Sequence, residues 1–427
     1  MSNASASMKR TTICWLASWL ACRLPVTPAQ TNTKLVLLVS LVSTIAISGC
    51  KHPATSSEAR PMKNVVVARK AGKFCGWPAN NGLWRWDGGR EMLVGFSFGD
   101  FVEQEGHNLK GRSDAASGVV SRLVRSLDGG RSWKVEDPEN FVGDGGVATD
   151  SPGGLDFQAP GFALRVVGVG YHGSQDPAGS FFASGDRGRT WRGPYRFGAL
   201  MTDPNLQGME LTARTRYLTT GSNSCLLFLS ARPSRSIPGQ IATDKSFVAE
   251  TTDGGRSFHF VSWIVQFQDP YRAVMPAVGR LANGTIIAAL RRRDVANAQV
   301  SCWVDCYTSR DNGRSWSFSS RVGQTGFENG NPPALTVLKD GRVVCAYGDR
   351  SRDKLFARVS ADEGKSWAAE VVLREDFQTD KFGDHDFGYP QLTTNERGDA
   401  VALYYWATKD LPQQHIAATI WKPGIHD

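Results

Sequence analysis

Short apolar runs, separated by turns rich in glycine and asparagine, dominate the chain from about residue 62 onward. The runs are rich in Val, Ile, Leu, Ala and aromatic residues, which is typical of β-strands. Clear examples lie at 161–170, 225–230, 285–290, 342–347 and 400–406. No long stretch places its apolar residues at helical spacing. The pattern therefore predicts an all-β protein.

One turn recurs five times between these runs. Its pattern is Ser or Thr, any residue, Asp, any residue, Gly, two more residues and then Trp or Phe. The copies lie at 126–133, 184–191, 251–258, 309–316 and 360–367. An Asp side chain accepts hydrogen bonds from its own turn, Gly adopts positive φ, and the aromatic ring packs on a sheet. We therefore expect each copy to close a β-hairpin, with a structural rather than a catalytic Asp.

The spacing of these turns predicts the architecture. Their Asp residues are 58, 67, 58 and 51 residues apart, which leaves room for several short strands in each unit. Repeats of this length with several strands are typical of a β-propeller. Strand-like runs before the first copy and after the last predict a six-bladed ring over residues 62–427. Pairing between the two ends of that region would close the ring and remove its open sheet edges.

Residues 1–49 are predicted to be an export signal. Residues 35–49 are apolar and uncharged and follow Lys34. This run is shorter than the about 20 residues of a membrane-spanning helix and fits a secretory signal. An earlier basic and apolar stretch, 9–22, is a rival signal.

The end of the apolar run, residues 47–50, resembles the lipobox of bacterial lipoproteins, in which the Cys is lipidated. The resemblance implies a lipidated Cys50, a tether over residues 50–61, and a bacterial lipoprotein anchored to a membrane in the periplasm or on the cell surface. The alternative is a signal that is cut elsewhere, with Cys50 incidental.

The charge of the chain gives little support to a polyanionic partner. The formal net charge is +8, and residues 1–49 contain four basic and no acidic residues, so +4 remains after their removal. We therefore expect no nucleic-acid partner. Cys302 and Cys306 form the only close cysteine pair of the predicted propeller, and no further ligands complete a zinc pattern nearby. Neither a metal nor another cofactor is expected.

The five turns are Asp boxes, and the chain resembles the sialidase (neuraminidase) superfamily of BNR-repeat, Asp-box propellers. Enzymes of this type use three Arg to hold a substrate carboxylate, a Tyr nucleophile backed by a carboxylate, and an Asp acid/base. Arg suits the first role because its planar guanidinium offers two parallel donors to a carboxylate. A Tyr nucleophile is a known exception among glycosidases.

The resemblance assigns the catalytic roles by position. Tyr389 follows the last box and precedes the run 400–406, where the family places its nucleophile. Asp386 is an adjacent polar candidate. The region ahead of the first box offers His107 as the acid/base in place of the expected Asp.

Two of the three positions at which the family has a carboxylate-binding Arg, called the clamp positions here, are also Arg in this chain. Arg291 ends the run after the turn at Asn283, and strand alternation places it on the same face as Arg293. Arg350 ends the run at 343–348, with Arg352 as an alternative.

Further residues are expected at the substrate. Asn331 lies in a loop that can present its amide to a sugar hydroxyl. In the segment 74–86 we expect Asn81 to bind substrate and Trp77 or Trp84 to stack on a sugar ring.

The chain also departs from the family. Gly76 occupies the place of the first clamp Arg, and the residues at 275–276 replace the Glu that supports the nucleophile. Another carboxylate, such as Glu328 or Asp386, would have to take that part.

The resemblance implies an exo-acting glycoside hydrolase that removes a terminal acidic sugar, sialic acid or a uronic acid, from a glycan partner. Two alternatives stay open. One is a uronic-acid-specific polysaccharide lyase, in which Tyr389 or His107 removes the C5 proton. The other is a carbohydrate-binding propeller that retains the boxes without the chemistry.

Overall fold

Antiparallel strands make up nearly all of the regular structure. The computed structural model describes residues 62–110, 119–137, 146–169, 176–212, 214–234, 244–294 and 300–424, and all of them belong to one unit, Glu58–Asp427. The predicted signal and Cys50 lie outside the described residues. Within the described ranges, no helix is long and apolar enough to cross a membrane.

The first two sheets follow the chain in order. The first sheet contains β2 (Lys73–Gly76), β3 (Leu83–Trp86), β4 (Glu91–Asp100), β5 (Val120–Ser126) and β6 (Lys134–Glu136). The second contains β7 (Ala163–Val167), β8 (Ser180–Ser184) and β9 (Arg192–Tyr195). A short helix, α1 (Pro78–Asn81), lies between β2 and β3, and 3₁₀ turns cover Asp87–Gly89 and Leu200–Thr202.

The third sheet has nine strands and consists of two antiparallel groups. One group is β10 (Met209–Leu211), β11 (Tyr217–Thr219), β12 (Cys225–Pro233), β13 (Lys245–Thr251) and β14 (His259–Trp263). The other is β15 (Arg272–Arg280), β16 (Ile286–Arg293), β17 (Cys302–Ser309) and β18 (Ser317–Gly326). A single parallel pair, Lys245 with Ala273, joins the two groups.

The last two sheets complete the arrangement. One contains β19 (Ala334–Val337), β20 (Val343–Asp349), β21 (Lys354–Ser360) and β22 (Val371–Arg374). The other contains β23 (Gly388–Thr394), β24 (Ala400–Trp406), β25 (His415–Trp421) and, from the other end of the chain, β1 (Lys63–Ala68). β1 pairs with β25 in antiparallel register, as predicted for the ends of the ring.

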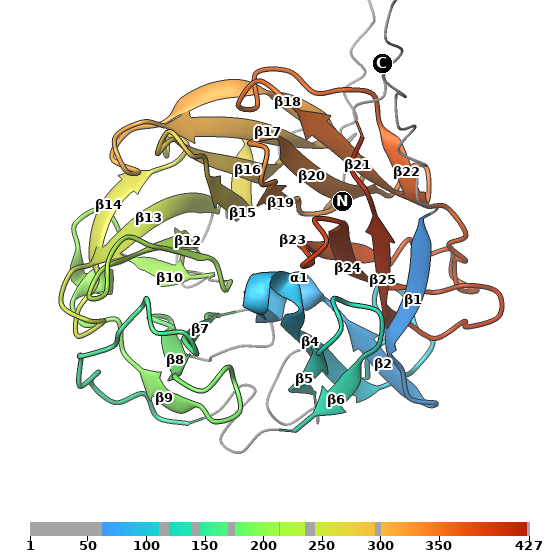
Figure 1. Cartoon of the computed structure of the whole chain (residues 1–427), viewed down its shortest axis with the longest axis horizontal. Coiled ribbons are helices and arrows are strands. Elements are labelled where there is room, and N and C mark those ends of the chain that lie inside the picture. The colour runs from blue at the N-terminus through green and yellow to red at the C-terminus, as the bar shows by residue number, and fades with distance from the viewer. Residues whose placement is uncertain are drawn as a thin grey trace, which may run out of the picture. The chain divides into compact units, whose positions relative to one another are not determined.

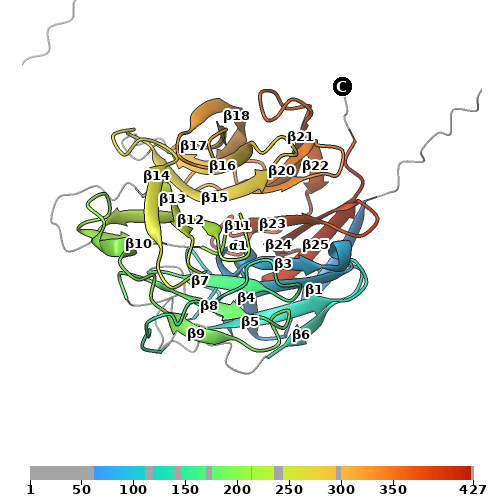
Figure 2. The same cartoon turned by 60° about the vertical axis from the view of Figure 1, so that its left-hand side comes forward.

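The sheets surround a common centre, with α1 near its middle (Figure 1). α1 lies beside β23 in both views (Figures 1 and 2). Neighbouring sheets pack through apolar faces; Leu355 of β21, for example, belongs to the same buried cluster as Tyr404 and Trp406 of β24. The predicted all-β, propeller-like fold is confirmed.

The five Asp boxes form the predicted hairpin turns. They connect β5 to β6, β8 to β9, β13 to β14, β17 to β18 and β21 to β22. In the first box, Asp128 Oδ1 accepts hydrogen bonds from the backbone nitrogens of Arg131 and Ser132, each at 2.9 Å. Asp128 Oδ2 accepts a bond from the Ser132 hydroxyl at 2.6 Å. The Asp uses its oxygens to hold the turn, so its role is structural.

Candidate functional site

A bulge at the start of β23 places Tyr389 at the centre of the molecule. Gly388 pairs with Tyr405 and Gln391 with Leu403, so two residues of β23, Tyr389 and Pro390, face one residue of β24. A bulge bends its strand and redirects a side chain. Pro390 donates no backbone hydrogen bond, so it fits at such an irregularity.

The start of β15 repeats this construction. Val274 pairs with Arg291 and Ala277 with Ala289, which leaves Met275 and Pro276 against one residue of β16. Arg291 therefore occupies the register position on β16 that Tyr405 occupies on β24. The bulges in β15 and β23 are thus alike, but the sheet of β15 supplies Arg291 to the centre and the sheet of β23 supplies Tyr389.

Three residues that precede prolines have left-handed backbones. φ is 47° at Tyr389, 58° at Met275 and 50° at Trp77. A following proline favours extended backbone, so this conformation is costly, at about 1–3 kcal/mol for each residue. The prolines that follow, Pro78, Pro276 and Pro390, belong to the bulged or helical segments at the centre. Backbone strain of this kind typically gathers at functional sites.

Asn331 fixes the position of Tyr389. Its Oδ1 accepts a hydrogen bond from the Tyr389 backbone nitrogen at 2.8 Å. A Cβ on Gly388 would lie 2.2 Å from the same Oδ1, so only glycine permits this approach. Asn331, which the sequence predicts to meet a sugar hydroxyl, uses its Oδ1 to hold the start of β23 that carries Tyr389.

Positively charged side chains surround the Tyr389 ring. Arg291 Nη1 lies 3.3 Å from the Tyr389 hydroxyl oxygen and donates to it. The guanidinium carbons of Arg214 and Arg291 lie 5.4 and 6.0 Å from the ring centroid. Tyr389 is only 9% exposed, and Arg291 3%. This packing places the phenol in a strongly positive environment with little screening by solvent.

The charges change the acidity of the phenol. Burial alone would raise the pKa of Tyr389, but the positive charges of Arg291, Arg214 and Arg350 outweigh it and lower the pKa to about 7. A substantial fraction of Tyr389 is therefore phenolate near neutral pH, whereas an ordinary Tyr has a pKa near about 10. A phenolate is a nucleophile and a base.

A partly buried histidine bonded to a buried carboxylate lies beside this phenol. His107 Nδ1 is 2.9 Å from Asp386 Oδ1, and the Tyr405 hydroxyl donates to the same oxygen. The charge of Asp386 raises the pKa of His107. Burial would raise the pKa of Asp386, but His107 and Arg350 hold it below its usual range. The ring edge of Trp77 packs on His107 at 5.1 Å between centroids, so His107 has a fixed orientation.

Arg350 joins the group from β20, where it directly follows the strand. Its Nη1 lies 3.1 Å from Glu328 Oε2, and Arg350 itself is buried while the Glu328 side chain is half exposed. Glu328 has a positive φ of 57°. We use the name Tyr389 site for the group made of Tyr389, Arg214, Arg291, Arg350, His107, Asp386 and Asn331.

Several buried polar atoms of the Tyr389 site have no hydrogen-bond partner among the described residues. They are Asp386 Oδ2, Asn331 Nδ2 and the Nε atoms of Arg291 and Arg350. Buried polar atoms are nearly always bonded, because an unsatisfied one costs about 1–3 kcal/mol. These donor and acceptor atoms around one phenol match, in their chemistry, the hydroxyl and carboxylate groups of a polar ligand.

The structure brings together most of the predicted site residues and separates two of them. Tyr389, His107, Asp386, Arg291, Arg350 and Asn331 lie in the Tyr389 site. Asn81 Oδ1 instead accepts bonds from Ser121 (2.8 Å) and Arg165 (3.2 Å) in a buried network. Trp84 donates to the Leu164 carbonyl at 3.2 Å and packs on Trp191 in the core, so neither ring face is open to a sugar.

The sequence did not identify two members of this region, Arg214 and Tyr405. Arg214 adds a third positive charge beside Tyr389, in a chain that has Gly76 at the sequence position of the family's first Arg. The only local signal was the alternation Arg-Thr-Arg at 214–216, ahead of β11. Among the described residues, no carboxylate bonds the Tyr389 hydroxyl. Asp386 instead forms hydrogen bonds with His107 and Tyr405, and Glu328 accepts one from Arg350.

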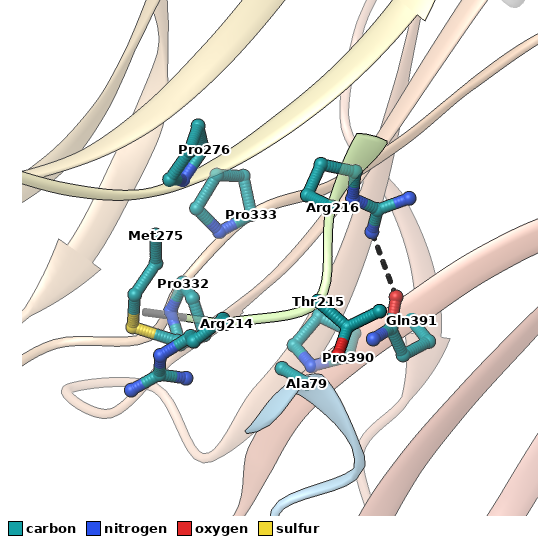
Figure 3. A pocket seen from close by; sticks show the side chains of 10 residues that line it. All are labelled: Ala79, Arg214, Thr215, Arg216, Met275, Pro276, Pro332, Pro333, Pro390 and Gln391. Atoms are coloured by element: carbon teal, nitrogen blue, oxygen red, sulfur yellow. Dashed lines mark hydrogen bonds between the residues drawn. The ribbon is translucent and has the colours of Figure 1, made fainter. Parts of the chain in front are cut away.

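A small pocket borders the Tyr389 site at Arg214. Ala79, Arg214, Thr215, Arg216, Met275, Pro276, Pro332, Pro333, Pro390 and Gln391 line it. Its volume of about 20 Å³ fits about one water molecule and no sugar ring. Arg214 and Arg216 lie on opposite sides of Thr215, and Arg216 donates to Gln391 at 2.8 Å (Figure 3). Within the described ranges, no three His, Cys, Asp or Glu side chains gather as metal ligands.

Fold and site together define a class: a propeller-like, all-β protein with a cationic polar site at its centre. The sequence pattern of the BNR repeat-like domain matches residues 157–401, which is more than half of the chain. The chain therefore belongs to the BNR repeat-like family, and the predicted membership of the sialidase-like superfamily is confirmed.

Solved structures share the fold at low sequence identity. A protein of unknown function from Dyadobacter fermentans is 18% identical, covers 85% of this chain and 99% of its own, and gives a TM-score of 0.61. An α-L-arabinofuranosidase of Fusarium graminearum in complex with arabinobiose is 15% identical, covers 84% of this chain and 97% of its own, and gives a TM-score of 0.50. A Hadza microbial sialidase is 15% identical, covers 80% of this chain and 65% of its own, and gives a TM-score of 0.50. No curated protein matches the chain. At these identities the structures establish the fold alone.

Proposed function

We propose that this protein is an exo-acting glycoside hydrolase that removes a terminal acidic sugar from glycans. The observation that carries the proposal is the Tyr389 phenol, with its hydroxyl bonded by Arg291 and its ring flanked by Arg214. Guanidinium groups recognise a sugar carboxylate, and the same charges keep the phenol ionised. The open polar atoms of Asp386 and Asn331 offer partners for sugar hydroxyls.

The fold neighbours support a carbohydrate substrate. The Fusarium protein is named as an α-L-arabinofuranosidase and the Hadza protein as a sialidase, and both names denote glycoside hydrolases. We also propose a ring of six blades, in which the two groups of the nine-stranded sheet count as separate blades.

The proposed reaction has two steps. Tyr389 phenolate forms a bond to the anomeric carbon, the glycosidic C–O bond breaks, and His107 imidazolium gives its proton to the departing oxygen. Water then attacks the same carbon, neutral His107 takes a proton from that water, and the bond to Tyr389 breaks to restore the phenolate. Arg291 stabilises the phenolate oxygen before and after each step, and Asp386 stabilises the imidazolium.

One observation favours the second candidate, a uronic-acid-specific lyase. Among the residues that the structure describes, no carboxylate bonds the Tyr389 hydroxyl as a nucleophile's partner would, and the phenol's pKa of about 7 suits a base. In this reaction the phenolate removes the C5 proton, arginine neutralises the uronate carboxylate, and the C4–O bond breaks to leave a C4–C5 double bond. His107 protonates the departing oxygen.

Product analysis separates the candidates. Sialosides, uronic-acid oligosaccharides and neutral arabinosides are incubated with the protein, and the products are identified by mass spectrometry and by ultraviolet absorbance of unsaturated uronates. We expect a free saturated sugar, and its loss in Tyr389→Phe and Arg291→Ala. An unsaturated product would replace the hydrolase with the lyase. Binding of these glycans without any product would identify a non-catalytic carbohydrate-binding protein.

The cellular location is proposed from the sequence. We propose an exported lipoprotein in which Cys50 carries the lipid and the propeller acts in the periplasm or at the cell surface. Cys50→Ser should move the protein from the membrane to the soluble fraction, and mass spectrometry of the N-terminal peptide should show acyl chains on Cys50. An unmodified Cys50 in a membrane-bound protein would contradict the anchor.

A further inference from the structure

A second pocket lies at the centre of the molecule, further along the innermost strands than the Tyr389 site. It has a volume of about 220 Å³ and is lined by the end of β15, by β19 and by the later part of β23, together with β3 and β11. Thr393, one of its lining residues, follows Tyr389 by four residues in β23, which is roughly 13 Å along a strand.

A packed layer separates the two regions. Gln391, which is buried, accepts from Arg216 at 2.8 Å and donates to the Pro78 carbonyl at 3.3 Å. Arg214 and Arg216 lie on opposite sides of Thr215 (Figure 3). Arg216 lines both the small pocket at Arg214 and the second pocket, whereas Arg214 lines only the small pocket. None of the residues that define the Tyr389 site lines the second pocket. The second pocket is therefore distinct from the Tyr389 site.

Three arginines line the second pocket: Arg85 on β3, Arg216 before β11 and Arg280 at the end of β15. In the described part of the chain, none of the three forms an ion pair with a carboxylate. Arg85 donates to the carbonyl and hydroxyl of Thr394, and Arg280 donates to the Gly284 carbonyl and to Asn312 Oδ1. Every partner is neutral.

These three differ from most of the arginines that the structure describes, which form ion pairs. Arg125, Arg187 and Arg352, for example, each pair with two carboxylates. Burial lowers the pKa of Arg85, Arg216 and Arg280, as expected for cations without a negative neighbour. Guanidinium carries five N–H donors, and the neutral partners use only some of them.

We propose that this three-arginine pocket binds a small, multiply charged oxyanion of the phosphate or sulfate type. Three positive charges balance more than one negative charge, and the planar donor pairs of arginine match the oxygens of such an anion. Thr336 and Thr393 also line the pocket and can add hydroxyl donors. A volume of about 220 Å³ admits a small anion or one ester group and is below the about 300 Å³ of typical sites for larger ligands.

The anion has two possible sources with the same chemistry: a free inorganic ion, or a sulfate or phosphate ester on a carbohydrate. Calorimetric titration at constant ionic strength compares inorganic phosphate, inorganic sulfate and a monosaccharide sulfate with chloride. Equal affinity for the inorganic ions and the ester identifies the free ion. Much tighter binding of the ester identifies the carbohydrate. Both results require saturable binding to one site.

Substitutions locate the binding site. Arg216→Gln and Arg280→Gln each retain a polar side chain, and each should weaken anion binding about tenfold or more, because a charge-assisted hydrogen bond is lost. Arg280 is the safer variant, since Arg216 also supports Gln391. Arg291→Gln, in the Tyr389 site, is the matched control and should bind the anion with unchanged affinity.

Two outcomes would overturn the proposal. One is the absence of saturable binding to the native protein at constant ionic strength. The other is binding that is lost in Arg291→Gln and retained in Arg216→Gln and Arg280→Gln, which would assign the anion to the Tyr389 site. Neither result depends on glycan turnover, so failure of the proposed enzyme activity and failure of the anion pocket are distinguishable.

Discussion

The Asp boxes and the Tyr389 site treat polar groups in opposite ways. Each box Asp is fully engaged by the backbone and hydroxyl groups of its own turn, and the arrangement is repeated five times. The Tyr389 site occurs once, contains a left-handed residue before a proline, Tyr389, and leaves buried polar atoms without hydrogen-bond partners among the described residues. The repeated, satisfied parts stabilise the fold, whereas the unique, unsatisfied part is available to a ligand.

The largest expected effect is that of Tyr389→Phe. It removes the attacking oxygen and should lower kcat by about 10³-fold or more if the phenolate acts in covalent or base catalysis. Steady-state kinetics on the best glycan substrate measures it. Tyr404→Phe is the control, because the Tyr404 hydroxyl bonds Thr419 at 2.6 Å in the core. That variant should lose about 1 kcal/mol of stability and retain its activity. Full activity of Tyr389→Phe would remove this residue from the mechanism.

Arg214→Gln should lower kcat/KM for acidic substrates by about 10²-fold, since a preorganised charge is removed. It should also raise the pKa of Tyr389, because Arg214 is one of the charges that hold that pKa at about 7. In a plot of activity against pH, the part of the curve that rises with pH, the rising limb, should therefore move to higher pH. Arg310→Gln, an exposed residue paired with Glu363, is the control and should leave the profile in place. An unmoved limb in Arg214→Gln would contradict the electrostatic role of Arg214.

Asp386→Asn tests the acid of the mechanism. The charge of Asp386 raises the pKa of His107, so its removal lowers that pKa. The active imidazolium is lost as pH rises through the His107 pKa, and the falling limb of activity should therefore move to lower pH. We expect kcat to decrease about 10- to 100-fold at neutral pH. An unchanged falling limb, together with a normal fold by circular dichroism, would show that another group supplies the proton.

Asp128→Ala tests the other side of the comparison. The Asp128 carboxylate holds the backbone nitrogens of Arg131 and Ser132. Its loss should lower the free energy of unfolding by about 1–3 kcal/mol, measured by urea denaturation, with no change in kcat. A large loss of activity without a loss of stability would contradict the structural role of the box.

The smallest expected effect is a loss of folding stability at low pH. The hydrogen bond from the Ser315 hydroxyl, with the other bonds of the turn, lowers the pKa of Asp311 to about 2. A carboxyl with a lowered pKa contributes stability above its ordinary pKa of about 4, and that contribution is lost as pH falls toward about 2. Stability measured by urea denaturation should therefore decrease over this interval, and less steeply in Asp311→Ala than in the native protein.

The sequence could predict those parts that local chemistry determines. Each box is a self-contained turn, so its Asp, Gly and aromatic residue identify a hairpin wherever they occur. The sequence predicts Tyr389 and Arg291 as site residues because their order relative to the boxes matches the sialidase-like family, and the structure places the two side chains in contact. The bulges at Met275 and Tyr389 had a weaker local signal, a proline at the start of a strand.

The remaining features depend on contacts between distant segments. Arg214 reaches Tyr389 from the connection between β10 and β11, and the Arg-Thr-Arg alternation at 214–216 does not indicate which distant residue it meets. Trp77 and Trp84 are seven positions apart and chemically identical, yet Trp77 packs on His107 while Trp84 lies in a buried cluster with Trp191. Which sheet covers a given side chain is decided only when the ring closes, so the sequence alone did not separate the two.

The pairing of β1 with β25 has a consequence for biosynthesis. Thr419 donates to Asn64 at 2.8 Å across 355 positions of sequence. At the usual rate of about 5–20 residues per second, a ribosome needs roughly 20–70 seconds to make that interval. β1 is therefore the first strand of the propeller to be synthesised and the last to find its partner, and until then it remains an open edge that neighbouring chains can pair with.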